Sequence, residues 1–368
     1  MNAANKCRCL PLEIFPIITP PGLTPPDISV IPSNIFSGCT KTTTPPLITT
    51  IKQPKTDKET WVIFDLIGAF SLVSAMASID ETPAWVIALD GNYIEPVQAD
   101  AFLVTNGQRY TILAKFTKPK KYTFRVSSVI ETQILFGTSV IDFQVEGIPQ
   151  STAPSVPFID ERGRNKTANV RFYDSSVAKP FPPTPPSQIV DATYKAIMQL
   201  DGALDRWALN TTARPDTEDV APPLLFAPVP GLQDNHTITV ASEASWVDYI
   251  LQVPPGLPPH PVHFHGRHFH VIGSGTGDFR WPTVAAAIRE IPSNFNLRNP
   301  QIRDTFTGPA SLTGSWVAVR RPSDNEGVWL IHCHIQGHVR GGMSMVIQDG
   351  TDGGIPVPNE YRNYKCAA

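Results

Sequence analysis

The sequence predicts an all-β fold built as two consecutive β-sandwiches, and three observations lead to this class. Proline is abundant, with 38 prolines against 24 glycines in 368 residues, and helix interiors tolerate proline poorly. Short runs rich in β-branched and aromatic residues recur, separated by turn residues. The chain is also long enough for two ordinary domains and tight for three. Short strands joined by many turns are therefore expected throughout.

The first sandwich is expected from residue 55, after a proline- and threonine-rich segment over 1–54 that we interpret as a linker or the remnant of another domain. Four runs are typical of strands: TWVIFDLI (60–67), AWVIALDG (84–91), AFLVTNGQRYTILAKF (101–116) and YTFRVSSV (122–129). Their spacing predicts an antiparallel sandwich that ends near Glu146, within a middle domain over 55–174. The longest apolar stretch, 62–79, contains Asp65, and a charge near a membrane centre costs about 2.5–3.5 kcal/mol. Buried strands are therefore favoured over a membrane span.

The second sandwich is expected over 191–368, after a stiff proline-rich linker over 175–190. Its strand-like runs are HTITVASEASWVDYILQV (236–253), HFHVIGSG (268–275), SWVAVRRP (315–322), GVWLIHCHI (327–335) and MSMVIQDG (343–350). The segment PTVAAAIREI (282–291) opens with proline and spaces its apolar residues helically, which predicts one short helix in this domain.

Charge and sequence signals limit the partners and the compartment. A net charge of −3 gives no reason to expect nucleic acid or an anionic membrane as a partner. The first fifteen residues have no apolar run long enough for a signal peptide. Three glycosylation sequons, at Asn165, Asn210 and Asn235, nevertheless suggest a secretory protein whose true start is missing from this sequence.

The cysteine count is odd, so at least one thiol is free or has another use. We interpret Cys7 and Cys9 as unpaired thiols or local disulfide partners in preference to a metal site, and Cys366 could bridge to an N-terminal cysteine. The sequence does not decide the connectivity. Cys333 stands apart from these because it lies among histidines.

Eight of the nine histidines fall in two short segments, and only His236 lies elsewhere. The first segment is His260-Pro-Val-His263-Phe-His265-Gly-Arg-His268-Phe-His270, and the second is His332-Cys333-His334-Ile-Gln-Gly-His338-Val-Arg-Gly-Gly-Met343. Alternate residues of a strand share a face. Two adjacent strands would then present four imidazoles on one side, from His263, His265, His332 and His334, and the Cys333 thiolate on the other.

This pattern predicts copper. One thiolate, two imidazoles and a weak thioether form the ligand set of a blue-copper electron-transfer site, and His260, Cys333, His338 and Met343 supply it. Four imidazoles on the opposite face suit harder copper ions. Zinc uses similar residues, but a single cysteine among so many histidines fits zinc poorly. His236, His268 and His270 are interpreted as ordinary core or surface residues.

At these residues the sequence resembles the multicopper oxidases, whose C-terminal domain carries His-Pro-x-His-x-His-Gly and His-Cys-His-x-x-x-His followed by methionine or leucine. Further motifs resemble the filamentous-fungal laccase-like branch: GSGTGDF (273–279), RDTF (303–306), NEGVW (325–329) and GGM (341–343). Upstream motifs resemble the family's middle domain: GAF (68–70), SID (78–80), DGNYIEP (90–96) and GQRY (107–110). The resemblance covers roughly residues 55–355 and implies cupredoxin-like Greek-key sandwiches.

The resemblance also implies roles for the residues. His260, Cys333, His338 and Met343 would bind type 1 copper, with His260 and Cys333 in the electron path. His263 would bind type 2 copper, and the type 3 pair would take His265, His332 and His334. The implied reaction removes single electrons from phenolic or aromatic substrates and reduces dioxygen to water, in some family members during pigment or other secondary-metabolite biosynthesis.

The sequence departs from the family pattern in three ways. Arg267 and Gly337 replace residues that are often histidine and aromatic, at positions that are not ligands. More seriously, no histidine precedes His236, although the family's first domain supplies two further His-x-His pairs. We therefore expect a complete type 1 site, half-complete type 2 and type 3 sites, and a chain that lacks the N-terminal cupredoxin domain.

Two other functions remain open. The chain could be an inactive or single-copper protein that binds or transfers electrons. It could also belong to a ferroxidase, which would need acidic residues beside His260. Asp248 and Glu290 are near in sequence, but we expect both to be solvated surface charges.

Overall fold

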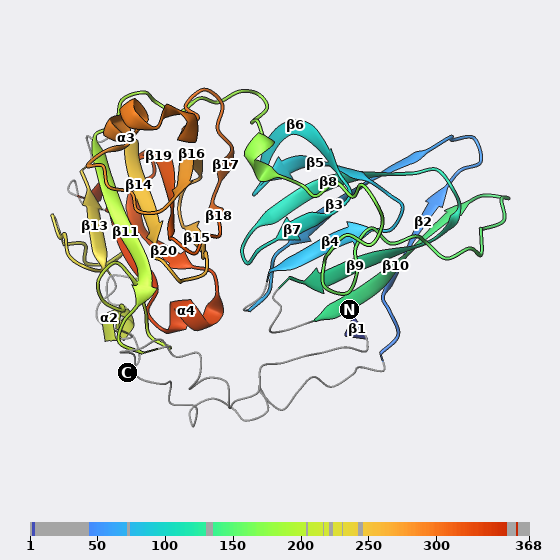
Figure 1. Ribbon diagram of the computed structural model, residues 1–368, viewed down its shortest axis with the longest axis horizontal. Helices are drawn as coiled ribbons and strands as arrows, with labels where there is room; N and C mark the ends of the chain where they lie inside the picture. Colours follow the sequence, from blue (N-terminus) through green and yellow to red (C-terminus); the bar gives the residue numbers. More distant parts are fainter. Residues whose placement is uncertain are drawn as a thin grey trace. The chain divides into compact units, whose positions relative to one another are not determined.

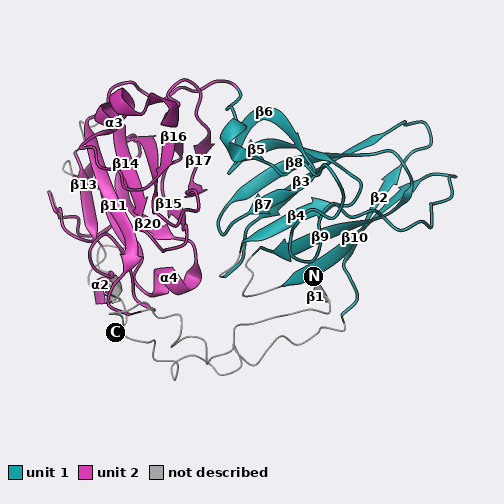
Figure 2. Cartoon of the chain, viewed as in Figure 1, with its two compact units in different colours: residues 1–18, 27–181 teal, residues 19–26, 182–368 magenta. Residues whose placement is uncertain are grey.

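The computed structural model describes residues 2–3, 44–71, 74–129, 135–203, 205–215, 217–220, 224–229, 231–241, 246–351 and 358–359. The chain divides into two compact units (Figure 2): unit 1, residues 1–18 and 27–181, and unit 2, residues 19–26 and 182–368. The expectations for Cys7, Cys9, Cys39 and Cys366 fall outside the described residues. Strands dominate both units (Figure 1), so the predicted all-β class is confirmed.

Unit 1 is a sandwich of two sheets. Its elements are β1 (Asn2–Ala3), β2 (Ile48–Gln53), β3 (Thr60–Ile67), β4 (Ala75–Ile79), β5 (Ala84–Leu89), β6 (Asn92–Ala99), β7 (Phe102–Val104), β8 (Arg109–Phe116), β9 (Lys120–Ser128), β10 (Phe136–Val145) and the 3₁₀ turn η4 (Ser175–Val177). One sheet has the order β1-β10-β9-β4-β7, with β2 beside β10, and the other has the order β3-β8-β5-β6. All four runs proposed as strands from the sequence form strands here.

Alternation of burial explains why these segments pair as they do. Along β8, Tyr110, Ile112, Ala114 and Phe116 are buried between the sheets while the residues between them are only partly covered. Most of the apolar stretch 62–79 lies in β3 and β4, and none of the helices in the described part of the chain is long and apolar enough to cross a membrane. β2 begins before residue 55 and runs parallel to β10, so this sandwich is not purely antiparallel.

Unit 2 is a second sandwich, and it carries both histidine segments. Its strands are β11 (Ala192–Leu200), β12 (Trp207–Leu209), β13 (Thr237–Val240), β14 (Trp246–Val253), β15 (Pro261–Phe264), β16 (Phe269–Thr276), β17 (Ile302–Arg303), β18 (Thr305–Thr307), β19 (Ser315–Pro322), β20 (Gly327–Cys333) and β21 (Ser344–Asp349). The sheets have the orders β12-β11-β14-β19-β16-β17 and β13-β21-β20-β15-β18. The pairs β11–β14 and β13–β21 are parallel.

The predicted helix is present as α3 (Val284–Glu290). The Thr283 side chain caps it by accepting a hydrogen bond from the Ala286 amide at 3.1 Å, and Pro292 follows its end. Its buried residues Val284 and Ala287 pack in a cluster with residues of β14, β16 and β19, so α3 covers the outer face of that sheet (Figure 1). The short elements α2 (Thr217–Val220), α4 (Gln336–Arg340) and η5 (Pro292–Asn294) complete the unit.

A buried ion pair lies in this covered sheet and corrects one expectation. Asp248 on β14 faces Arg320 on β19, with Nε–Oδ1 and Nη2–Oδ2 distances of 2.7 and 2.9 Å, and both residues are buried. Arg320 also donates to the Ser187 carbonyl at 2.6 Å. Asp248 is therefore not a surface charge, because it is buried in its pair with Arg320, and the linker contacts that pair at Ser187. Glu290 is exposed, as expected, and pairs with Arg280 at 3.0 Å.

Candidate metal centre

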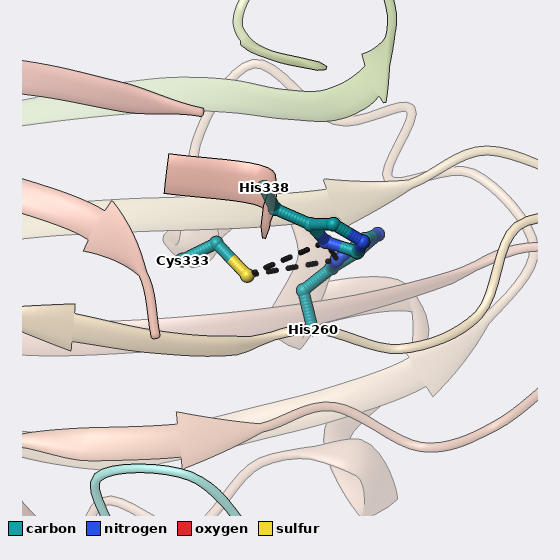
Figure 3. Close-up of side chains that lie close together, drawn as sticks. All are labelled: His260, Cys333 and His338. Carbon is teal, nitrogen blue, oxygen red and sulfur yellow. Dashed lines mark hydrogen bonds between the residues drawn. The ribbon is translucent and has the colours of Figure 1, made fainter. Parts of the chain in front are cut away.

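The first candidate metal group consists of His260, Cys333 and His338, whose side chains point toward one another (Figure 3). His260 directly precedes β15, Cys333 ends β20, and His338 lies on α4. The Cys333 Sγ atom is 3.8 Å from His260 Nδ1 and 3.7 Å from His338 Nδ1, and the two Nδ1 atoms are 3.0 Å apart. A metal about 2.0–2.3 Å from each ligand atom holds such atoms roughly 3–4 Å apart, so this triangle fits one ion.

Burial prepares these donors for a metal. It lowers the pKa of His260 to about 3, with His338 adding repulsion, and the pKa of His338 to about 4. Both imidazoles are therefore neutral at pH 7 and keep a lone pair. Burial also raises the pKa of the Cys333 thiol to about 12. The thiol thus keeps its proton until a cation replaces it.

Copper binding to this group at pH 7 is expected to release about one proton per chain, all of it from Cys333. The two histidines are already neutral at pH 7, since their lowered pKa values lie near 3 and 4. Calorimetric titration with Cu(I) in two buffers of different ionisation enthalpy counts the protons released. Release of two or three would contradict the neutral state of His260 and His338.

Met343 is linked by backbone hydrogen bonds to two residues of the first metal group. Its amide donates to the His338 carbonyl at 2.9 Å, and its carbonyl accepts from the Cys333 amide at 3.1 Å. Met343 and Cys333 are both fully buried members of one apolar cluster. The backbone therefore fixes Met343 relative to two of the three donors.

The second group lies across the same strand pair. β15 and β20 are antiparallel, with His263 opposite His332 and Val262 opposite Cys333. His263, His265 and His332 bring their nitrogens within 4.8 Å of one another, and the His265 and His332 Nε2 atoms are 3.2 Å apart. His334 is close by, with its ring centroid 5.6 Å from that of His332 and 5.9 Å from that of His263. The four imidazoles expected on one face therefore gather there.

Hydrogen bonds orient two of these rings. His263 Nδ1 is 3.0 Å from the Asp304 carbonyl oxygen, and His332 Nδ1 is 2.8 Å from the Cys333 carbonyl oxygen. A carbonyl only accepts, so each Nδ1 carries the proton and each Nε2 is left as the donor atom for a metal. Asp304 lies in a motif quoted from the sequence, but its backbone role could not be read from the sequence.

A tight turn holds His265. Gly266 follows it at φ +80°, and a Cβ there would meet the Trp329 indole at 2.3 Å. Asn325 donates to the Gly266 carbonyl at 2.7 Å, and Arg267 forms an ion pair with Asp324. The departure at Arg267 therefore contributes a contact that braces the turn.

The other histidines lie outside both groups. His236 Nδ1 is 2.7 Å from Glu218, and His270 Nε2 is 2.9 Å from the Thr184 carbonyl. His268 Nε2 is 3.6 Å from Asp304. No pattern in the sequence selects Trp207, whose ring stacks on His338 at a centroid distance of 4.0 Å. Its strand comes from a distant part of the sequence, and no local pattern marks it.

Comparisons with known proteins agree with this geometry. Two family models, both described as multicopper oxidase, match residues 48–141 and 205–353, which together make up more than half of the chain. The multicopper oxidase elcG of Phaeosphaeria nodorum is 33% identical over 318 residues, covering 83% of this chain and 50% of its own length. The laccase abr2 of Aspergillus fumigatus is 33% identical over 331 residues, covering 88% and 55%. The chain thus spans about half the length of these relatives.

Solved structures support the fold. The laccase from Botrytis aclada superposes with a TM-score of 0.65 at 20% identity, covering 94% of this chain and 63% of that one. Fet3p, a multicopper oxidase that functions in iron import, gives 0.63 at 18% identity, covering 83% and 58%. Taken with the family models and the fungal relatives, these likenesses show that the chain belongs to the multicopper oxidase family.

Proposed function

We propose that this chain is the type 1 copper-bearing part of a laccase-like multicopper oxidase. One observation carries the proposal: Cys333, at the end of β20, meets His260 and His338, while four imidazoles gather around the neighbouring His263–His332 pair of β15 and β20. His332, Cys333 and His334 are consecutive, so only a few covalent bonds separate the two groups. A short covalent link of this kind suits transfer of electrons one at a time.

The proposed type 1 ligands are His260, Cys333, His338 and Met343. Copper bound there would supply reversible one-electron chemistry, and the Met343 thioether would be a weak fourth ligand. The residues of the chain hold the ligand atoms in place, keep both imidazoles neutral and exclude water. His260 is 1% exposed and Cys333 is fully buried, so His338, which is only partly buried, offers the more accessible edge for an electron donor.

The histidines at 263, 265, 332 and 334 are proposed as this chain's share of an oxygen-reducing copper cluster. By likeness to the family, His263 would bind type 2 copper, and the type 3 pair would take His265, His332 and His334. These four are half of the ligands that such a cluster uses in the family. The chain's part in oxygen reduction would be to hold these imidazoles beside the Cys333 backbone.

For the whole oxidase we propose one-electron oxidation of small phenolic or aromatic substrates, coupled to reduction of dioxygen to water. Relatives named as laccases support this substrate class. A role in pigment or other secondary metabolism and a secretory route, with glycans at Asn165, Asn210 or Asn235, are parts of the same proposal. The proposed domains remain 55–174 and 191–368, joined by a linker over 175–190.

A ferroxidase is the second candidate, favoured by the fold shared with Fet3p. It would need carboxylates beside His260 to hold iron. Asp248 is buried against Arg320, and Glu290 is engaged by Arg280. Neither of these two acidic residues is therefore free to bind iron. Oxidation of phenolic or aromatic substrates is favoured over ferroxidase activity.

The test is copper per chain together with the visible absorption spectrum and oxygen uptake on a phenol. We expect one copper in the Cys333 group with an intense blue thiolate band, and no oxygen uptake by this chain alone. No blue band at any copper loading would refute the type 1 assignment. About four coppers with oxygen consumption would refute the assignment of only half a cluster to this chain.

A further inference from the structure

Trp207 covers the proposed copper centre. Its ring stacks on the His338 imidazole, with a centroid distance of 4.0 Å and an interplanar angle of 22°. The same ring meets His260 edge-on at 5.1 Å and 68°. Only 8% of Trp207 is exposed. One aromatic side chain therefore contacts both imidazoles of the group.

The backbone ties Trp207 to the segment that carries the ligands. Trp207 lies on β12 opposite Leu200 of β11. On its other side, its amide donates to the Gly341 carbonyl at 2.9 Å, and the Arg214 amide donates to the Gly342 carbonyl at 3.0 Å. The two glycines connect α4, which carries His338, to β21, which follows Met343 directly.

The close approach of these two segments depends on glycine. A Cβ at Gly341 would lie 2.2 Å from the Asp205 carbonyl oxygen. Gly342 has a φ of +101°, and a Cβ there would lie 2.8 Å from the Arg214 backbone. The backbone of residues 205–214 therefore packs directly against Gly341 and Gly342, with no room for a side chain between them. This contact places the Trp207 indole over His338.

We propose that Trp207 is a positioning residue for the type 1 copper: it fixes the plane of the His338 ring and keeps water from the ligand atoms. The inference rests on the proposed function. A stacked indole opposes rotation of the imidazole about its side-chain bonds, so the Nδ1 atom stays aimed at the position between His260 and Cys333. An apolar cover also favours the reduced site, which carries less charge, and thereby raises its reduction potential.

The alternative is that Trp207 only fills space in the hydrophobic core and has no effect on copper. Another buried tryptophan in unit 2 is the control for this alternative. Trp316 is 2% exposed and stacks on Phe295 at 5.5 Å and 28°. It belongs to the apolar cluster beneath α3, which is separate from the cluster that contains Trp207 and Cys333. Loss of ring area at Trp316 tests packing alone, and loss at Trp207 tests packing together with the copper centre.

The experiment loads the full chain with copper and compares W207L, W207F and W316F with the unaltered chain. The readouts are copper affinity by chelator competition, the blue absorption band, and the reduction potential. We expect W207L to weaken copper binding by about 10–100-fold, to reduce the blue band and to lower the potential. W207F keeps a flat ring over His338 and should recover most of the affinity.

The control separates the outcomes. W316F should lower the melting temperature and leave the copper spectrum, affinity and potential unchanged. Unaltered spectrum and potential in both Trp207 variants, or equal changes in W316F, would overturn the inference. If the W207L chain does not fold, the reduction potential of W207F decides: its smaller ring covers less of the His338 imidazole and should lower the potential, whereas W316F should not. Absence of the blue band in the unaltered chain would instead overturn the proposed function.

Discussion

Replacement of Cys333 by serine is expected to abolish the intense blue absorption of the copper-loaded chain. The hydroxyl is a hard, poorly ionised ligand, and it cannot give the charge-transfer band of a copper thiolate. Copper affinity at this group should fall by more than the roughly 10–100-fold that loss of a supporting contact costs. Titration with copper, followed by absorption and metal analysis, measures both effects.

The control for this variant is His236→Asn. His236 lies outside both metal groups and is held by Glu218 and Thr212. We expect H236N to keep the blue band and the copper count of the unaltered chain. A blue band that survives in C333S would show that another thiolate binds the copper, and the type 1 assignment would then be wrong.

Replacement of Asp248 by alanine is expected to lower the free energy of unfolding by about 3–5 kcal/mol, the range for removing one partner of a buried ion pair. Arg320 would keep its charge in a buried position with only the Ser187 carbonyl as a described acceptor. Urea unfolding followed by tryptophan fluorescence measures the change. The blue spectrum of the folded variant should be unaltered, because Asp248 belongs to neither metal group.

Glu290→Ala is the matched control, since it removes the exposed partner of the Arg280 pair. Exposed pairs of this kind contribute little to stability, so E290A should unfold at the same urea concentration as the unaltered chain. Equal stability of D248A and the unaltered chain would mean that Arg320 reaches solvent after the substitution, and the described burial would then be wrong.

Much of the fold follows from local pattern. The run 60–67 and the run 315–322 correspond to β3 and β19, and the proline-led helix is α3. The alternation of His332, Cys333 and His334 at the end of β20 was enough to predict a thiol and imidazoles on opposite faces, because strand geometry is local. The same logic gathered His263 and His265 with His332.

The features that could not be predicted from the sequence depend on contacts between segments that are far apart in the chain. Asp248 sits in a strand-like run whose second face would be open to water in a bare sheet, and the linker residue Ser187 contacts its partner Arg320 there. Trp207 belongs to a three-residue strand, and its stack on His338 depends on the glycines at 341 and 342. Neither arrangement leaves a periodic signal in the sequence.

The pairing of β15 with β20 has a further consequence for how metal enters. His260 and Cys333 are 73 positions apart, so their meeting requires closure of a long loop. Before that closure, a copper ion would meet His332, Cys333 and His334 as three consecutive residues. Once β15 and β20 have paired, Cys333 and the two histidines belong to different copper groups on opposite faces. In the unfolded chain, one copper ion could therefore bind ligands that belong to two different groups in the folded protein. We expect correct copper loading to require that the sheet forms before copper binds.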